Sequence, residues 1–117
     1  STHILADPLH LTNILHNLLD NAMKYCRQQP QITVSTVNEG NSIRLTVADR
    51  GIGIPREYQE RVFQKFFRVP TGNVHNVKGF GLGLFYIKNI CRSHGWKVQL
   101  DSEAGVGTSI FISMKTI

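Results

Sequence analysis

Four stretches of the sequence alternate apolar and polar residues with the two-residue period of a half-buried strand, and they come in two pairs. They lie at residues 31–37, 42–49, 96–100 and 108–115. Turn-forming letters join each pair, NEGN in the first and DSEAGVG in the second. A helix-like stretch precedes each pair, from Asp7-Pro8 to about Tyr25 and from GFGLGL to about His94. This order, repeated after a long loop, predicts a two-layer α/β sandwich.

The composition fits one small domain. A chain of 117 residues with 41% hydrophobic content fills one core, and its net charge of +5 suits an anionic partner such as a nucleotide, a nucleic acid or a membrane surface. Its longest apolar runs span only a few residues, so we expect no membrane-spanning segment. Cys26, Cys91 and the scattered histidines match no zinc-binding spacing, so any metal is expected to arrive with a ligand.

Two asparagines interrupt the first predicted helix, although asparagine is a mediocre helix former. The helical period places Asn21 at the border between two faces. The expected buried face holds Leu11, Leu15, Leu18, Leu19 and Ala22, and the opposite face holds His10, Asn13, Asn17, Asp20 and Lys24. Either asparagine alone is readily explained as a solvated residue. Asn17, Asn21 and Lys24 share an edge, however, and amide oxygens that bind Mg²⁺ beside an ammonium suggest a triphosphate site.

Asp49 has the same parity as the apolar residues of its strand, so alternation directs its carboxylate to the covered face. A buried carboxylate is costly without a hydrogen-bond donor, so we expect it to have one there. The following DRGIGIP is also compatible with an ordinary turn. A buried acceptor next to Gly51 and Gly53, whose backbone permits close approach, suits the exocyclic amine of adenine.

Residues 63–78 form a long polar stretch without a clear period, which predicts a lid. Its phenylalanines are expected to be core or lid anchors, and Arg68 and Lys78 add positive charge. GFGLGL follows this loop and lacks the Lys-Ser/Thr of a phosphate-binding P-loop. It still provides flexible glycines that open a helix, whose N-terminal amides attract phosphate.

The order of these motifs resembles the ATP-binding catalytic domain of bacterial sensor histidine kinases. NLLDNAMKY is similar to the N box of that family, DRGIGIP to the G1 box, FQKFFRV to the F box, GFGLGL to the G2 box and GTSIFI to its last glycine-threonine element. The resemblance covers about residues 7–114. It implies the Bergerat ATP-binding fold, with a mixed sheet covered on one face by helices. The family usually has an extra upstream strand, so we interpret STHILA as the remnant of a trimmed edge strand.

The resemblance also implies roles for individual residues. Asn21 would bind Mg²⁺, Asp49 would bind the adenine amine, and Asn17, Lys24 and Arg68 would act near the phosphates. Tyr25 would lie along the nucleotide, and glycines 79, 81 and 83 would hinge the lid. The full ATP-binding set implied is Asn17, Asn21, Lys24, Tyr25, Asp49, Gly51, Gly53, Ile54, Arg68, Lys78, Gly79, Gly81, Leu82, Gly83, Leu84 and Thr108.

Asn17 separates this sequence from related ATPases. The gyrase, chaperone and mismatch-repair ATPases carry a glutamate there as general base, whereas an amide has no useful basicity. The resemblance therefore implies a kinase that holds Mg-ATP and transfers phosphate to a histidine. In that family, an acidic residue typically follows the histidine that accepts the phosphate. None of the five histidines here has that neighbour, so we expect the phosphate-accepting histidine on a separate dimerisation domain.

The wider context implied is a cytoplasmic domain of a two-component sensor kinase. A response regulator receiver domain would be an indirect partner, and any membrane contact would come through other parts of the parent protein. Two alternatives remain open. One is a nucleotide-binding module that has lost phosphotransfer. The other is a nucleic-acid-binding domain, against which the dispersed basic residues argue.

Overall fold

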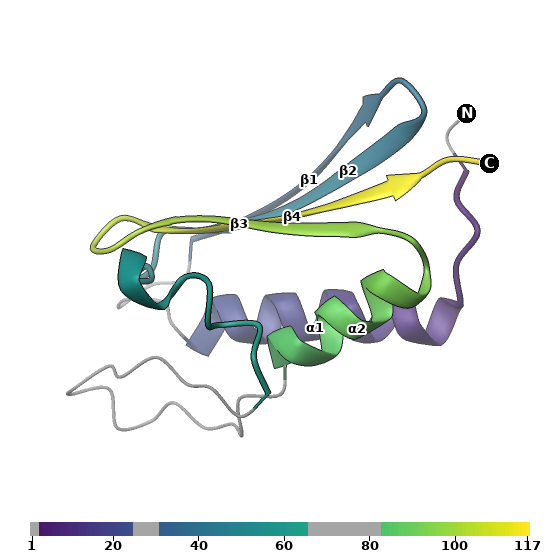
Figure 1. Cartoon of the computed structure of the whole chain (residues 1–117). Helices are drawn as coiled ribbons and strands as arrows, with labels where there is room; N and C mark the ends of the chain where they lie inside the picture. The colour runs from purple at the N-terminus through teal and green to yellow at the C-terminus, as the bar shows by residue number, and fades with distance from the viewer. Residues whose placement is uncertain (1–2, 25–30, 66–82) are drawn as a thin grey trace.

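The computed structural model describes residues 3–24, 31–65 and 83–117. Its elements are α1 (Pro8–Lys24), β1 (Ile32–Glu39), β2 (Ser42–Asp49), the 3₁₀ helix η1 (Arg56–Tyr58), α2 (Gly83–Ser93), β3 (Lys97–Glu103) and β4 (Gly107–Lys115). The two α-helices lie side by side on one face of the sheet (Figure 1). This arrangement confirms the predicted two-layer α/β sandwich. Between β2 and the end of the second described range, the chain forms the single 3₁₀ turn η1 followed by further turns.

The sheet has the strand order β1-β2-β4-β3, and every neighbouring pair is antiparallel. This corrects the expectation of a mixed sheet for the described strands. Short turns at residues 40–41 and 104–106 join consecutive strands, and turns of that length permit only antiparallel pairing. Before α1, Ile4 forms an isolated antiparallel bridge with Thr116, so the described part of the proposed edge-strand remnant contributes this one bridge.

The core lies between the sheet and the two helices. Its fully buried side chains are Ile14, Leu18, Ile87, Cys91 and Ile112. Leu19 was expected on the buried face of α1 but is 39% exposed. The buried face is centred on Ile14, Leu18 and Ala22, and each residue turns the helix by about 100°, which carries Leu19 past the edge of the sheet-facing surface.

Both helix ends expected from the sequence are confirmed. The Asp7 side chain caps α1, because its Oδ1 accepts hydrogen bonds from the backbone amides of Leu9 at 2.9 Å and His10 at 3.3 Å. Gly95 has a φ of 71° after α2, and the amide of Trp96 donates to the Cys91 carbonyl at 2.8 Å. This left-handed cap reverses the chain and places Trp96 in the core.

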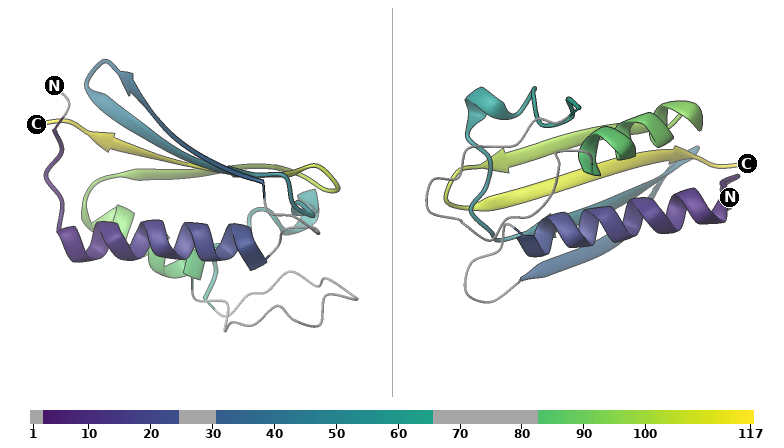
Figure 2. Two further views of the ribbon diagram at one scale, coloured as in Figure 1. Left: turned by 180° about the vertical axis from the view of Figure 1, so that it is seen from behind. Right: turned by 90° about the horizontal axis from the view of Figure 1, so that it is seen from below.

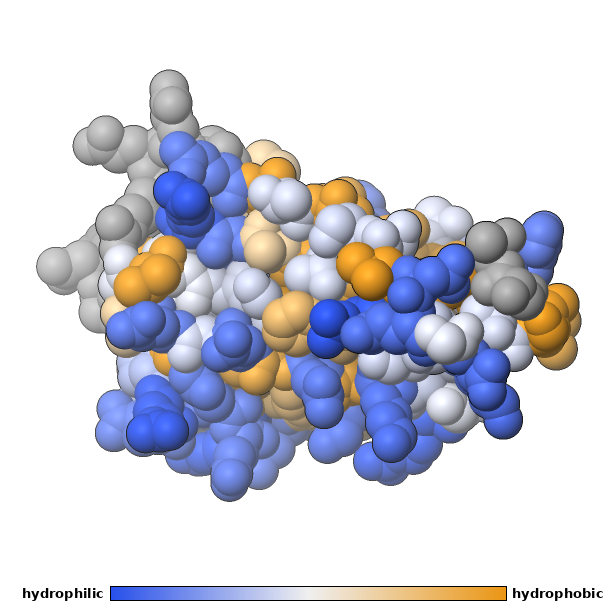
Figure 3. All heavy atoms as spheres, turned by 90° about the horizontal axis from the view of Figure 1, so that it is seen from above, coloured by the Kyte–Doolittle hydropathy of each residue, from blue (hydrophilic) through white to orange (hydrophobic). Residues whose placement is uncertain are grey.

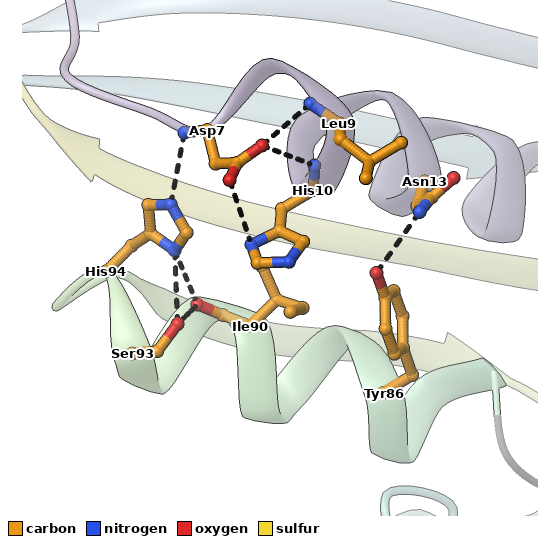
Figure 4. A network of polar contacts seen from close by, with 8 residues as sticks. All are labelled: Asp7, Leu9, His10, Asn13, Tyr86, Ile90, Ser93 and His94. Atoms are coloured by element: carbon orange, nitrogen blue, oxygen red, sulfur yellow. Dashed lines mark hydrogen bonds and ion pairs between the residues drawn. The ribbon is translucent and has the colours of Figure 1, made fainter.

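Polar contacts join the start of α1 to the end of α2 (Figure 4). The Asp7 amide donates to His94 Nε2 at 3.3 Å, so Nδ1 carries the hydrogen that reaches the Ile90 carbonyl at 2.9 Å. Asn13 Nδ2 donates to the Tyr86 hydroxyl at 3.3 Å farther along the same pair of helices. The polar side of α1 therefore includes side chains that contact α2.

The other face of the sheet has no helix over it and is largely hydrophilic, with scattered apolar patches (Figure 3). Arg44 lies 5.4 Å from the ring centre of Phe111 on this face and pairs with Glu39 at 3.3 Å. Among the described residues, the buried apolar core therefore lies on the helix-covered face of the sheet.

Candidate functional site

The predicted asparagine motif of α1 and the start of α2 lie side by side. The two helices run antiparallel beneath the sheet (Figure 2), so the last turns of α1 lie beside the first turn of α2. A Cβ added to Gly83 would lie 3.9 Å from Asn17 Oδ1. Asn17 and Gly83 are 66 residues apart in the sequence, and helix packing brings their two motifs together.

Asn21 and Lys24 continue the same edge of α1 toward its C-terminus. Asn21 is half-buried, as its border position predicted. Lys24 Nζ lies 3.1 Å from Asp20 Oδ2 in an i, i+4 ion pair whose side chains are 33% and 51% exposed. Such a pair stabilises a helix by only about 0.3–0.5 kcal/mol, so a polyphosphate could compete for the ammonium.

Asp49 has the expected inward orientation and the expected donor. Its Oδ1 accepts a hydrogen bond of 2.9 Å from the backbone amide of Gly51. Burial raises the pKa of the Asp49 carboxyl, and backbone hydrogen bonds from Gly51 and Thr108 partly oppose this shift. The carboxyl group is therefore a half-buried acceptor at the end of β2, with one oxygen already fixed by the backbone.

The loop after Asp49 packs against the β3–β4 turn so closely that glycine is required at its contact point. Gly53 has a φ of 72°, and a Cβ there would overlap the Glu103 carbonyl group. The Gly105 amide donates to the Ile52 carbonyl at 2.8 Å across the same contact. Gly107 is equally restricted, since a Cβ would overlap the Asp49 carbonyl oxygen. These contacts fix the backbone of residues 51–54 against the β3–β4 turn.

Two side chains that the sequence did not single out fasten this loop. The Ile54 amide donates to Ser102 Oγ at 2.8 Å. Gln59 Nε2 donates to the Ile54 carbonyl at 2.9 Å and to the Ser102 carbonyl at 2.8 Å. Ser102 is 48 residues from Ile54 in the chain, and no local pattern connects them. Only the tertiary fold identifies this contact.

The remaining predicted residues divide into two groups. Leu84 packs against the core at the start of α2, and Thr108 is 8% exposed at the start of β4, opposite Asp49. Outside the described residues lie Tyr25, Arg68, Lys78, Gly79, Gly81, Leu82 and most of the proposed lid. Among the residues that are described, no group of three or more His, Cys, Asp or Glu side chains could hold a metal ion, and no helix is long and apolar enough to cross a membrane.

Comparison with known families identifies the class of protein. Residues 6–116 match the family described as histidine kinase-, DNA gyrase B-, and HSP90-like ATPase, so the chain belongs to this family. It is 45% identical over 113 residues to the sensor protein RprX of Bacteroides fragilis, covering 95% of this chain and 22% of that protein. It is 35% identical over 111 residues to the sensor-like histidine kinase SenX3 of Mycolicibacterium smegmatis, covering 95% of this chain and 29% of that protein.

Solved structures show the same fold. A mycobacterial sensor histidine kinase, MprB, has a TM-score of 0.85 and 28% identity, with 96% of this chain and 76% of that chain covered. Full-length ShkA in complex with AMPPNP has a TM-score of 0.80 and 28% identity, with 97% of this chain and 23% of that chain covered. These neighbours confirm the resemblance to histidine kinase catalytic domains. The chain spans less than a third of the length of the two curated relatives above.

Gly53→Ala should destabilise the fold far more than Gly40→Ala. Both glycines have positive φ, 72° and 62°, but a Cβ at Gly40 meets nothing within 4 Å. Strain alone should cost Gly40→Ala about 1–2 kcal/mol, whereas the added overlap with Glu103 should cost Gly53→Ala on the order of 3 kcal/mol or more. Urea unfolding of each variant measures its loss of free energy of unfolding relative to wild type. Equal losses would show that the contact with the β3–β4 turn does not matter.

Asp49→Asn should leave the protein at least as stable as wild type at neutral pH. Because burial raises the pKa of Asp49, the folded state favours the protonated form, and ionisation above that pKa opposes folding. The melting-temperature advantage of the variant should therefore be largest at neutral pH and shrink as the pH falls through the raised pKa. Thermal melts from pH 3 to 8 test this, with exposed Asp101→Asn as control. An advantage that grows on acidification contradicts the prediction.

Proposed function

We propose that this chain binds Mg-ATP and supplies the γ-phosphoryl group to a histidine on a separate dimerisation domain of its parent kinase, in two-component signal transduction. The observation that carries the proposal is the meeting of Asn17 with Gly83, together with the half-buried Asp49 carboxyl group and its glycine loop at the end of β2. Family membership supports the nucleotide, and the structural neighbour ShkA was solved with AMPPNP, an ATP analogue. A response regulator receiver domain would be the indirect partner.

Nucleotide recognition would begin at Asp49. Its carboxylate offers an acceptor to the exocyclic amine of adenine, and the close packing of Gly53 on Glu103 would hold the adjacent loop in place beside the base. Apolar contact with the base would come from Ile54 and Leu84, which are both half-buried. The adenine site would thus be held by the loop that Ser102 and Gln59 fasten.

The triphosphate would extend toward α1 and the start of α2. The half-buried Asn21 supplies the amide oxygen that a hard ion such as Mg²⁺ accepts as a ligand. When bound, Mg²⁺ neutralises charge on the phosphates. The Lys24 ammonium would exchange Asp20 for phosphate oxygens, and the N-terminal amides of α2 would add donors. The proposed phosphate contacts of Arg68 and Lys78 remain predictions.

The chemistry requires positioning more than proton transfer within this domain. A neutral imidazole nitrogen of the acceptor would attack the γ-phosphorus in line, the bond to the bridging oxygen would break, ADP would leave, and the imidazolium would lose its second N–H proton. Asn17 faces Gly83 where a hydrolytic relative would hold a base, and its amide cannot activate water. The γ-phosphoryl group would therefore stay on ATP until the acceptor histidine is positioned to attack it.

Incubation with γ-labelled ATP should leave this chain unlabelled and label only an added dimerisation segment that contains an acceptor histidine. The structure places His10 and His94 at the end of the helices remote from Gly83, and His16 is exposed on α1. A segment with its histidine changed to glutamine is the matched control. Acid-labile, base-stable label on this chain alone would refute the separate acceptor. ATP binding without any transfer would favour the binding-module alternative.

Asn21→Ala should weaken Mg-ATP binding about 10–100-fold, the range expected for a lost contact to a charged group. Calorimetry with Mg²⁺ and with chelator separates the metal-dependent part, which should be the part that disappears. Asn13→Ala is the matched control, because Asn13 lies two turns earlier on α1 and contacts Tyr86. Loss of affinity that is the same with and without Mg²⁺ would argue against Asn21 as the ligand.

A further inference from the structure

Ser102 lies at the centre of a hydrogen-bond network behind the Asp49 carboxyl group. Its Oγ accepts the Ile54 amide at 2.8 Å, donates to the Gly107 carbonyl at 2.9 Å and lies 2.8 Å from Thr108 Oγ1. A serine hydroxyl has one hydrogen and two acceptor lone pairs. Ser102 can therefore satisfy all three contacts only if its hydroxyl donates in one of them and accepts in the other two.

One assignment of hydrogens satisfies all three contacts. Ser102 donates to Gly107, accepts from Ile54 and accepts from the Thr108 hydroxyl, so the Thr108 hydrogen is committed to Ser102. If Ser102 donated to Thr108 instead, the Gly107 carbonyl would lose this donor. Thr108 is only 8% exposed, which leaves water little access to compensate.

The direction of the Thr108 hydroxyl matters because Asp49 is its neighbour. The two residues are cross-strand partners, and their strand parity places both on the helix-covered face of the sheet. Cross-strand Cβ atoms on one face lie about 5 Å apart, which is within reach of a rotated threonine hydroxyl. A released Thr108 hydrogen would therefore donate to the Asp49 carboxylate and occupy an acceptor position.

We infer that Ser102 is a positioning residue for base specificity: by holding the Thr108 hydroxyl hydrogen, it keeps the Asp49 carboxylate free to accept from the exocyclic amine of a purine. This inference rests on the proposed function, because it assigns Asp49 to the adenine amine. It adds a residue that would touch neither nucleotide nor metal. Its effect on base specificity would pass through Thr108, whereas its contact with the Ile54 amide would support the loop for either base.

The test compares ATP with inosine triphosphate, which carries a carbonyl oxygen where adenine has its amine. Wild type should prefer ATP, and Ser102→Ala should weaken ATP binding about tenfold, the effect of one lost hydrogen bond to a charged acceptor. Its affinity for inosine triphosphate should change less, so the preference should narrow. In a Thr108→Val background there is no hydroxyl to release, so Ser102→Ala should leave the ratio of the two affinities unchanged. Ser113→Ala, on the outer face of β4, is the matched control.

The outcomes separate this inference from a structural role and from the proposed function. Parallel loss of both affinities would mean that Ser102 only supports the loop, and it would overturn the inference, as would an unchanged ratio. A Ser102→Ala effect on this ratio that persists in the Thr108→Val background would also overturn it. If Ser102→Ala does not fold, Ser102→Cys is used instead, because it replaces the hydroxyl with a weaker donor. Its preference for ATP over inosine triphosphate must then be smaller than that of wild type. A wild type that binds no ATP rejects the proposed function itself.

Discussion

Placing a carboxylate on the covered face of a sheet is the constraint around which this fold is arranged. Asp49 continues the inward side of β2, and the backbone amides of Gly51 and Thr108 help to make its charge tolerable there. The turn after Asp49 brings residues 51–54 against the β3–β4 hairpin, where Gly53 and Gly107 allow backbone contacts that no side chain permits. The acceptor and the loop that surrounds it are therefore one structural unit.

The two ends of the helical layer have different roles. At one end the Asp7 amide donates to the His94 ring, and the same ring donates to the Ile90 carbonyl. Internal hydrogen bonds therefore join the start of α1 to the end of α2. At the other end Asn17 faces Gly83, and Lys24 has an exposed partner in Asp20 that a ligand could replace at little cost. The antiparallel helices thus combine a hydrogen-bonded junction at one end with the edge of α1 to which the proposed function assigns the phosphates.

Local patterns predicted the parts of the fold that local chemistry determines. The Asp7 and Gly95 caps, the two hairpins and the inward orientation of Asp49 followed from capping residues, turn residues and alternation. The exposure of Leu19 did not, because the buried arc of a helix depends on where the sheet and the second helix lie.

The expected mixed sheet came from the family resemblance, and the register of the described strands corrected it. Ser102 and Gln59 had no local signal at all, since their partners lie elsewhere in the chain. The sequence predicted those site residues whose positions follow from strand alternation or from the start of a helix. It did not predict those whose hydrogen bonds join distant segments.

Under the proposed function, Asn17 would explain how this fold holds a reactive phosphate without hydrolysing it. Hydrolysis needs a base that removes a proton from water during attack, whereas a neutral imidazole already presents a lone pair. An amide beside the first turn of α2 retains the shape and polarity of a phosphate site without that basicity. The barrier to reaction with water then stays high while the barrier to histidine depends on docking geometry. In such a site, control of phosphate transfer passes from the chemistry of the pocket to the approach of the partner.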